Sequence, residues 1–251
     1  MKLDNVKKLH QKKYRAEFGH YLLEGEHLIL ELVKASERQP HLLKSILYVS
    51  PEYVQWAHDL PISFNVIELT TKQMNNISDT KTPPGIIACV PLESTDQLTP
   101  NTTTSADSQR YVYLHEVQDP GNLGTIIRTL AWFGDVTLLL SPNSVDPFNA
   151  KVVRASMGAL FYVPIEQDIS LAQLNERFDE FAYLDMNGES IAATSFKTMP
   201  CYVFGNEARG VPRDALTQMP ATAFTIKGAG NIESLNLASA VNMCMYELMG
   251  R

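Results

Sequence analysis

The chain has 251 residues, of which 45% are hydrophobic and 20% charged, enough for one large domain or two ordinary domains with a buried core. No apolar run is long enough to cross a membrane, and the basic, polar N-terminal stretch lacks the apolar segment of a secretory signal, so we expect no membrane partner. The net charge of -7 argues mildly against nucleic acid as a partner, and three widely spaced cysteines without a CxxC pair argue against disulfides or zinc and favour the cytoplasm.

The first twenty residues differ from the rest in charge, with six basic side chains against two acidic ones. Leu9, Tyr14 and Phe18 are interleaved with these charges. A charge run is usually a solvated helix face, whereas basic residues mixed with aromatic ones also suit an edge that faces RNA. Charge alone leaves the two interpretations equal.

Residues 1–92 have the pattern of a small α/β domain. One apolar set recurs at the spacing of a helix face, namely Leu28, Ile29, Leu32 and Val33. Short apolar runs predict four strands, at 21–23, 45–49, 64–69 and 85–90. No cluster of catalytic residue types is found here, so we expect the chemistry to lie further along the chain.

Residues 93–110 mark the one clear break in composition. Eight of the seventeen residues at 93–109 are Ser or Thr, and Leu98 is the one large apolar side chain among them. Such a segment buries too little apolar surface to offset the entropy of ordering it. We therefore predict a polar linker between two domains, 1–92 and 111–251.

Residues 111–251 alternate between apolar strands and helices. Strands are predicted at 112–115, 136–140, 161–165, 182–186, 202–204 and 223–226. Helices are predicted after Asn122, as the N-cap, and at 151–159, 171–181 and 235–249. This alternation indicates a mainly parallel sheet with helices on both faces, in which ligands bind beyond the carboxyl ends of the strands.

Two glycine-rich turns imitate nucleotide loops but miss a required residue. The turn at 205–210 has phosphate-loop spacing, yet Val-Pro follows where Lys and Ser or Thr are needed. The turn at 227–233 has Glu233 in place of the third glycine of a dinucleotide fingerprint, which disfavours hydride transfer. The six histidines show no ligand spacing, so no metal site is predicted, and His115 is interpreted as a structural histidine with satisfied hydrogen bonds.

Five polar residues remain near strand ends and helix starts: Asn122, Arg128, Glu207, Ser234 and Asn236. Each has a purely structural explanation. Asn122 and Ser234 can cap helices, with Asn236 then in the first turn. Glu207 can cap the helix after its turn, and Arg128 can pair with a carboxylate at the edge of a packed helix. Their concentration at three junctions in one half of the chain favours one shared catalytic site.

These residues lie in three segments that resemble the signature motifs of the SpoU (TrmH-type) RNA ribose 2′-O-methyltransferases, within the knotted SPOUT class. The Asn and Arg of the first motif fall on Asn122 and Arg128. The Gly-Asn-Glu of the second falls on residues 205–207, and the Ser-Leu-Asn of the third on 234–236. Similarity to the family and to its common substrate-binding domain extends to four further segments, at 12–15, 23–25, 79–85 and 146–158.

The resemblance implies a deep C-terminal trefoil knot, an exception to the usual unknotted topology. It implies a homodimer with the knot at the interface. It also implies S-adenosylmethionine as cofactor, held by backbone groups at Gly205, Ile226 and Leu235. Lys227 departs from the pattern, because relatives often have Pro after that Ile.

The implied reaction is methylation of a ribose 2′-hydroxyl in RNA. Arg128 is expected to bind the neighbouring phosphate and stabilise the developing alkoxide, in its own or the partner's site. The ribose and the cofactor loops are expected to be oriented by Asn122, Glu207, Ser234 and Asn236. RNA phosphates are expected to be gripped by Lys8, Lys12, Lys13 and Arg15.

We therefore expect a cytoplasmic, S-adenosylmethionine-dependent RNA methyltransferase. Ribosomal RNA is favoured as substrate because a substrate domain before the knot is commoner among members that act on it, and transfer RNA is the alternative. A non-catalytic RNA-binding protein on the same fold is the second hypothesis. A nucleotide-dependent oxidoreductase is a distant third.

Overall fold

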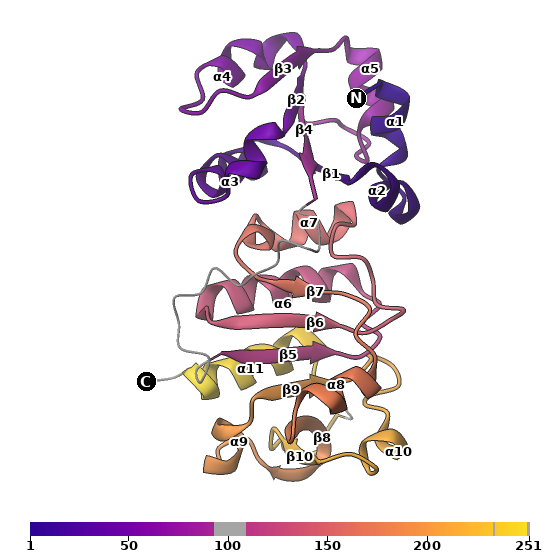
Figure 1. Ribbon diagram of the computed structural model, residues 1–251, viewed down its shortest axis with the longest axis vertical. Coiled ribbons are helices and arrows are strands. Elements are labelled where there is room, and N and C mark those ends of the chain that lie inside the picture. Colours follow the sequence, from indigo (N-terminus) through magenta and orange to yellow (C-terminus); the bar gives the residue numbers. More distant parts are fainter. Residues whose placement is uncertain (93–108, 233, 250–251) are drawn as a thin grey trace. The chain divides into compact units, whose positions relative to one another are not determined.

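The computed structural model describes residues 1–92, 109–232 and 234–249. The predicted linker at 93–110 therefore lies almost entirely outside the described residues. The chain forms two compact units (Figure 1). The first unit consists of Met1–Thr99 and Asp146–Tyr162, and the second of Pro100–Val145 and Val163–Arg251.

A four-stranded sheet with the order β1-β4-β2-β3 forms the centre of the first unit. β2 and β3 are parallel, whereas β4 is antiparallel to both of its neighbours. All four predicted strands are confirmed, with ends that shift by one residue. Their bounds are β1 His20–Glu24, β2 Ile46–Val49, β3 Asn65–Glu68 and β4 Ile86–Pro91.

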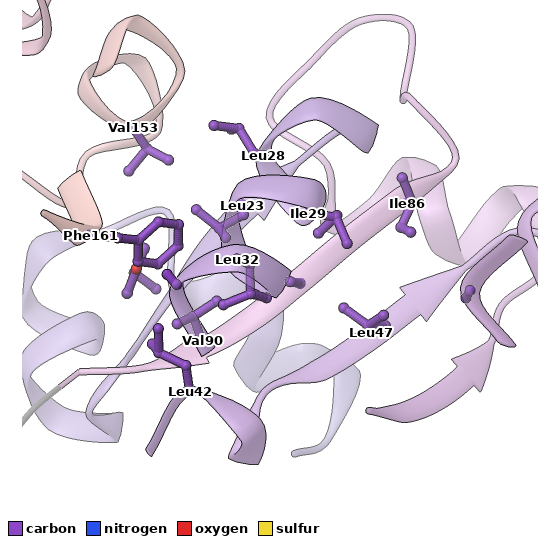
Figure 2. Close-up of a cluster of buried hydrophobic side chains, with 14 of the residues drawn as sticks. Leu23, Leu28, Ile29, Leu32, Leu42, Leu47, Ile86, Val90, Val153 and Phe161 are labelled. Carbon is purple, nitrogen blue, oxygen red and sulfur yellow. The ribbon is translucent and has the colours of Figure 1, made fainter. Parts of the chain in front are cut away.

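Helices cover both faces of this sheet, because successive strand side chains point to opposite sides. Leu23 of β1 belongs to a buried cluster with α3, which Figure 2 shows, whereas Leu22 packs with side chains of α1 and α5. The helices of this part of the chain are α1 Leu3–Lys8, α2 Lys12–Phe18, α3 Glu26–Ser36, α4 Val54–His58 and α5 Thr71–Ile77, with 3-10 turns at Pro40–Lys44 and Pro51–Tyr53.

The segment Asp146–Tyr162 returns to the first unit from the middle of the chain. It contains α7, Ala150–Ser156, and a 3-10 turn, Ala159–Phe161. Val153 and Phe161 enter the cluster of Figure 2 beside Leu32. The Gln39 side chain also donates to the Phe161 carbonyl at 2.6 Å. The sequence interpretation placed this segment in a domain at 111–251, whereas its packing belongs to the N-terminal unit.

Arg15 is buried in the same unit and contradicts one sequence prediction. Its side chain is 4% exposed, and its guanidinium donates to the Asp146 carboxylate at 2.5 and 2.9 Å and to the Leu9 carbonyl at 2.7 Å. A guanidinium held in this way is not available to RNA. Arg15 is therefore removed from the predicted RNA-binding set. The sequence could not indicate the pair, because the carboxylate partner lies 131 residues away.

A six-stranded sheet with the order β10-β8-β9-β5-β6-β7 forms the second unit. Every pair of neighbours is parallel. The predicted α/β class with a parallel sheet is confirmed, and the knot stays a prediction. The strands are β5 Arg110–Leu114, β6 Val136–Leu140, β7 Ile165–Glu166, β8 Phe181–Ser190, β9 Cys201–Phe204 and β10 Ala221–Thr225.

Helices lie on both faces of this sheet as well (Figure 1). On one face, Tyr113 of β5 packs with Leu174 of α8 and Leu216 of α10. The neighbours of Tyr113 along β5 point to the opposite face, where α6 packs on β6 and on α11. The helices are α6 Pro120–Phe133, α8 Leu171–Arg177, α9 Thr194–Thr198, α10 Arg213–Leu216 and α11 Leu237–Met249.

The strand order brings the carboxyl ends of β9, β5 and β6 together at one edge of the sheet. The backbone N–H of His115, just after β5, donates to the Phe204 carbonyl at the end of β9. The Ser141 amide, just after β6, donates to the Leu114 carbonyl. Segments far apart in the sequence thus meet where ligands of parallel sheets bind.

Candidate active site

The helix α6 begins one turn earlier than predicted. Asp119 is its N-cap, with the side chain accepting from the Asn122 amide at 2.7 Å, and Pro120 occupies the first helical position. Asp followed by Pro is a typical helix start, so this signal was available in the sequence. Because Asp119 caps the helix, the Asn122 side chain is free for other contacts.

Glu207, in the turn after β9, holds the start of α6. Its carboxylate accepts from the backbone amides of Gln118 and Asp119 and from the Asn122 side chain, each at 3.2 Å. The predicted structural alternative, a cap for the helix after its own turn, is not what the side chain does. Instead, a charged acceptor joins two junctions that lie more than 80 residues apart in the sequence.

The loop that carries Glu207 closes very tightly. Asn206 and Gly210 exchange two backbone hydrogen bonds, at 2.8 and 3.0 Å. A side chain at Gly205 would place its first carbon 2.1 Å from the Gly210 carbonyl carbon. Only glycine therefore allows this turn to close as it does.

Asn236 brings the third junction to the same place. Its Nδ2 donates to Asn122 Oδ1 at 2.8 Å, and its own Oδ1 accepts from the Ser239 amide at 3.2 Å. Asn236, not Ser234, therefore caps α11, which begins at Leu237 rather than at residue 235. The three predicted motifs are joined by one hydrogen-bonded chain that runs from Asn236 through Asn122 to Glu207.

Two predicted site residues stay outside this chain. Ser234 is exposed and makes no side-chain hydrogen bond to another described residue. Arg128 is exposed on α6, and its guanidinium makes no hydrogen bond or ion pair with the described residues. Among the described residues, the carboxylate partner that a purely structural role would give Arg128 is therefore not found.

The loop between β10 and α11 has the properties of a binding loop. Backbone groups of residues 226–232, 234 and 235 make no hydrogen bond to another described residue. Ile232 and Leu235 are exposed apolar side chains beside these free amides and carbonyls. Such a combination suits a ligand with a flat apolar ring and a polar edge, as the adenosyl group has. The residues predicted for the cofactor, Ile226 and Leu235, lie within this loop.

His115 differs from its predicted role. Its Nδ1 is buried and has no hydrogen-bond partner among the described residues, so the imidazole is not fully satisfied. Burial lowers its pKa, although the Glu116 carboxylate raises it in part. The ring is therefore neutral at pH 7 and lies against Tyr113, with 6.4 Å between the ring centroids.

No group of three or more metal-binding side chains occurs within residues 1–92, 109–232 and 234–249. In the same part of the chain, no helix has both the length and the hydropathy needed to cross a bilayer. Cys89, Cys201 and Cys244 are all buried, and burial raises the thiol pKa of Cys89 and Cys244 to about 12.

Residues 109–246 match the SpoU rRNA Methylase family, which is more than half of the chain. The chain belongs to this family. Residues 2–88 match the MRM3-like substrate binding domain. The family resemblance of the three motifs and of the N-terminal segments is therefore confirmed.

Two relatives cover different shares of the chain. It is 29% identical to the 23S rRNA (guanosine(2553)-2′-O)-methyltransferase RlmP of Bacillus subtilis, across 99% of this chain and 96% of the relative. It is 32% identical to the mitochondrial rRNA methyltransferase 3 of Mus musculus, across 62% of this chain and 37% of that protein.

Solved structures agree with the fold. An AdoMet-bound rRNA methyltransferase from Sinorhizobium meliloti is 25% identical, with a TM-score of 0.77, and the match covers 98% of this chain and 93% of that one. AviRb from Streptomyces viridochromogenes, solved in complex with AdoMet, has a TM-score of 0.82 at 21% identity, over 98% of this chain and 96% of that one, which supports the fold alone.

Proposed function

We propose that this chain transfers the methyl group of S-adenosylmethionine to a ribose 2′-hydroxyl of ribosomal RNA. The observation that carries the proposal is the hydrogen-bonded chain of Asn236, Asn122 and Glu207. It joins the three family motifs at the carboxyl edge of the sheet, beside a loop with unpaired backbone groups. The B. subtilis relative, matched over nearly its whole length, is named as a ribosomal RNA ribose methyltransferase.

The residues of this chain supply orientation and charge, while the bound cofactor supplies an electrophilic methyl group. Glu207 fixes the Asn122 amide, and Asn122 in turn fixes Asn236, so the orientation of both amide groups is defined. A ribose hydroxyl placed by these groups is held in line for attack, which removes much of the entropic barrier. Ser234 extends the polar wall, and backbone groups at Gly205, Ile226 and Leu235 hold the cofactor.

Arg128 is proposed to bind the phosphate beside the target ribose and to stabilise the developing alkoxide. Its guanidinium has no protein partner among the described residues, as a group reserved for substrate requires. Because it makes no hydrogen bond to Asn122, Glu207 or Asn236 of its own subunit, we assign it to the site of the partner subunit.

An apolar surface on α6 and α11 supports the proposal of a homodimer. Thr125, Arg128 and Trp132 share one exposed stripe of α6, and Trp132 is 86% exposed. On α11, which packs against α6, Tyr246 is 70% exposed and Met243 is also exposed. Large apolar side chains gathered on adjacent helices are typical of a protein interface. We propose that a second copy covers them, and that the C-terminal knot lies at this contact.

The N-terminal unit is proposed to bind the RNA. Lys8, Lys12 and Lys13 are exposed, and the Nζ atoms of Lys8 and Lys13 lie 5.4 and 5.6 Å from the centre of the Tyr14 ring. Basic side chains around an aromatic ring suit a nucleic-acid backbone with an unstacked base. We propose that the enzyme works in the cytoplasm, where ribosomal RNA is its substrate.

The test is a methyl-transfer assay on bulk ribosomal RNA and bulk transfer RNA, with calorimetric titration of S-adenosylmethionine. We expect transfer to ribosomal RNA and its near loss in Arg128→Ala. Transfer to transfer RNA alone would support the alternative substrate. Cofactor binding without transfer to any RNA, or undiminished transfer by Arg128→Ala, would contradict the proposed mechanism.

The shared site has its own test in mixed dimers. Arg128→Ala and Glu207→Ala chains, carrying different affinity tags, are co-expressed and purified through both tags. If Arg128 serves the partner's site, each mixed dimer holds one intact site and recovers about half of the wild-type activity. If Arg128 serves its own subunit, both sites are damaged and the mixture stays inactive.

A further inference from the structure

An open cavity of about 500 Å³ lies next to the Asn122–Glu207 chain, on the side of β6. Its lining comes from the segments that follow β5, β6 and β9, and includes Glu116, Gln118, Asn143, Asn206 and Arg209. None of these lining side chains is large and apolar. Gln118 links the cavity to the candidate active site, because its backbone amide donates to the Glu207 carboxylate.

Glu116, one of the residues that line this cavity, is held by its backbone. Its φ of 49° places the backbone in the left-handed region, which residues other than glycine seldom adopt. Its amide donates to Ser141 Oγ at 2.6 Å, and its carbonyl accepts from Asn206 Nδ2 at 2.7 Å. These contacts fix the direction in which the Glu116 side chain leaves the backbone.

The Glu116 carboxylate is occupied by Arg209. One carboxylate oxygen forms an ion pair with the Arg209 guanidinium, and the other accepts from Asn143 Nδ2 at 3.4 Å. Arg209 is exposed, and Asn206 Oδ1 accepts from its backbone amide at 3.1 Å. The pair therefore joins a fixed carboxylate to an exposed guanidinium in the lining of the cavity.

We propose that this cavity is a phosphate-binding subsite for the RNA strand next to the methylated ribose, and that Glu116 is an internal competitor for Arg209. The proposal rests on the proposed function, because the RNA substrate is the ligand. A partly exposed carboxylate–guanidinium pair is weak, and a phosphate oxygen pair matches the same guanidinium fork. Arg209 thus exchanges Glu116 for a phosphate when the strand enters.

Two polar atoms are ready for the nucleotide that accompanies this phosphate. Gln118 uses its Nε2 for the carbonyls of Glu116 and Asn143, at 3.2 and 2.6 Å, which leaves its Oε1 without a described partner. Asn143 Oδ1 likewise has none. Both are acceptors, so they suit donors on a base edge or a ribose hydroxyl.

The exchange predicts opposite effects for the two partners. Glu116→Gln is expected to tighten the binding of a fluorescently labelled, mixed-sequence single-stranded RNA by about two- to fivefold, because Arg209 is then free. Arg209→Ala is expected to weaken binding by about five- to tenfold and to reduce the slope of log affinity against log salt by about 0.7. The double variant is expected to match Arg209→Ala, since Glu116 acts only through Arg209.

A matched control exists between β7 and α8, outside the lining of the cavity. Glu166 and Arg177 form a similar ion pair, at 2.8 Å, with the Arg177 guanidinium over the ring of Tyr111. Glu166→Gln is expected to leave RNA affinity unchanged. Melting temperatures and calorimetric affinity for S-adenosylmethionine are measured for every variant, so that a folding or cofactor defect is recognised.

The outcomes separate this proposal from the proposed function. One contradicting outcome is that wild-type protein methylates RNA while Glu116→Gln weakens RNA binding or leaves it unchanged. In that case the Glu116–Arg209 pair only connects two loops, and the proposed exchange of Glu116 for phosphate is wrong. If no RNA is methylated at all, the proposed function fails, whereas opposite affinity changes in the two variants would still support the subsite.

Discussion

At the scale of single residues, the site depends on one carboxylate with three donors. Glu207 accepts from two backbone amides and from Asn122, so its charge holds two loops and one side chain together. This role explains the glutamate at position 207, although its side chain does not cap the helix that follows its turn.

Glu207→Gln is expected to lower kcat/KM for methyl transfer by about 10- to 100-fold, the usual effect of losing hydrogen bonds to a charged group. The neutral amide has one acceptor oxygen for three donors, so in either orientation at least one of the three donors faces its NH₂ group. Steady-state kinetics with Glu166→Gln as the control check the effect. Equal rates for the two variants would contradict a positioning role for Glu207.

The pH dependence of stability follows from His115. Burial lowers its pKa in the folded state, so the unfolded chain binds the proton more readily. Stability is therefore expected to fall as the pH drops from the ordinary histidine pKa of about 6.5 toward the lower folded value. Urea unfolding at pH 7.5 and 5.5 is compared between wild type and His115→Gln. The variant is expected to lose less stability, and an equal loss in both would contradict this reading.

At the scale of elements, the turn after β9 decides the geometry of the site. The turn after β9 needs Gly205, where a side-chain carbon would come 2.1 Å from the Gly210 backbone. Gly205→Ala is expected to displace the Glu207 loop and to reduce both melting temperature and S-adenosylmethionine affinity. Gly228 has open space around it, so Gly228→Ala is expected to preserve the melting temperature and is the control for stability alone. Unchanged melting and calorimetry in Gly205→Ala would show that the turn tolerates a side chain.

Most strands and the fold class were predictable because their apolar runs are short, buried and separated by clear breaks. The strand predicted at 161–165 was wrong except at its last residue, because Phe161 ends a 3-10 turn and β7 is Ile165–Glu166. The residues at which helices begin were less predictable. Asn122 and Ser234 were predicted as caps, whereas Asp119 and Asn236 take those places. Local patterns list several acceptable capping residues, and tertiary contacts choose among them. The same limit hid the bond between Asn122 and Asn236, because no pattern within one segment reports a partner 114 residues away.

At the scale of the molecule, the buried pair of Arg15 and Asp146 links the two chain segments that form the N-terminal unit. Arg15→Met is expected to destabilise that unit by about 3–5 kcal/mol, because the Asp146 carboxylate is left buried without its counter-ion. Lys34→Met, which removes an exposed pair with Glu31, is the control and is expected to change little. Urea unfolding checks both. Equal stability of the two variants would show that the pair contributes nothing net.

The charge pattern of the first twenty residues could not show that Arg15 belongs to a buried ion pair. Its neighbours Lys12 and Lys13 are exposed, and nothing near Arg15 in the sequence marks a buried carboxylate. Only the return of the chain at Asp146 reveals the partner. The predicted RNA-binding set therefore keeps Lys8, Lys12 and Lys13 as a proposal and loses Arg15.

The return of Asp146–Tyr162 also limits how this protein can be taken apart. Val153 and Phe161 fill the cluster around Leu32, so residues 1–92 alone would leave that apolar surface open to water. A graft of the N-terminal half onto another catalytic domain would require two splices rather than one. We expect that recombination between family members succeeds only when both segments are exchanged together, so that the two parts of the gene are inherited as one unit.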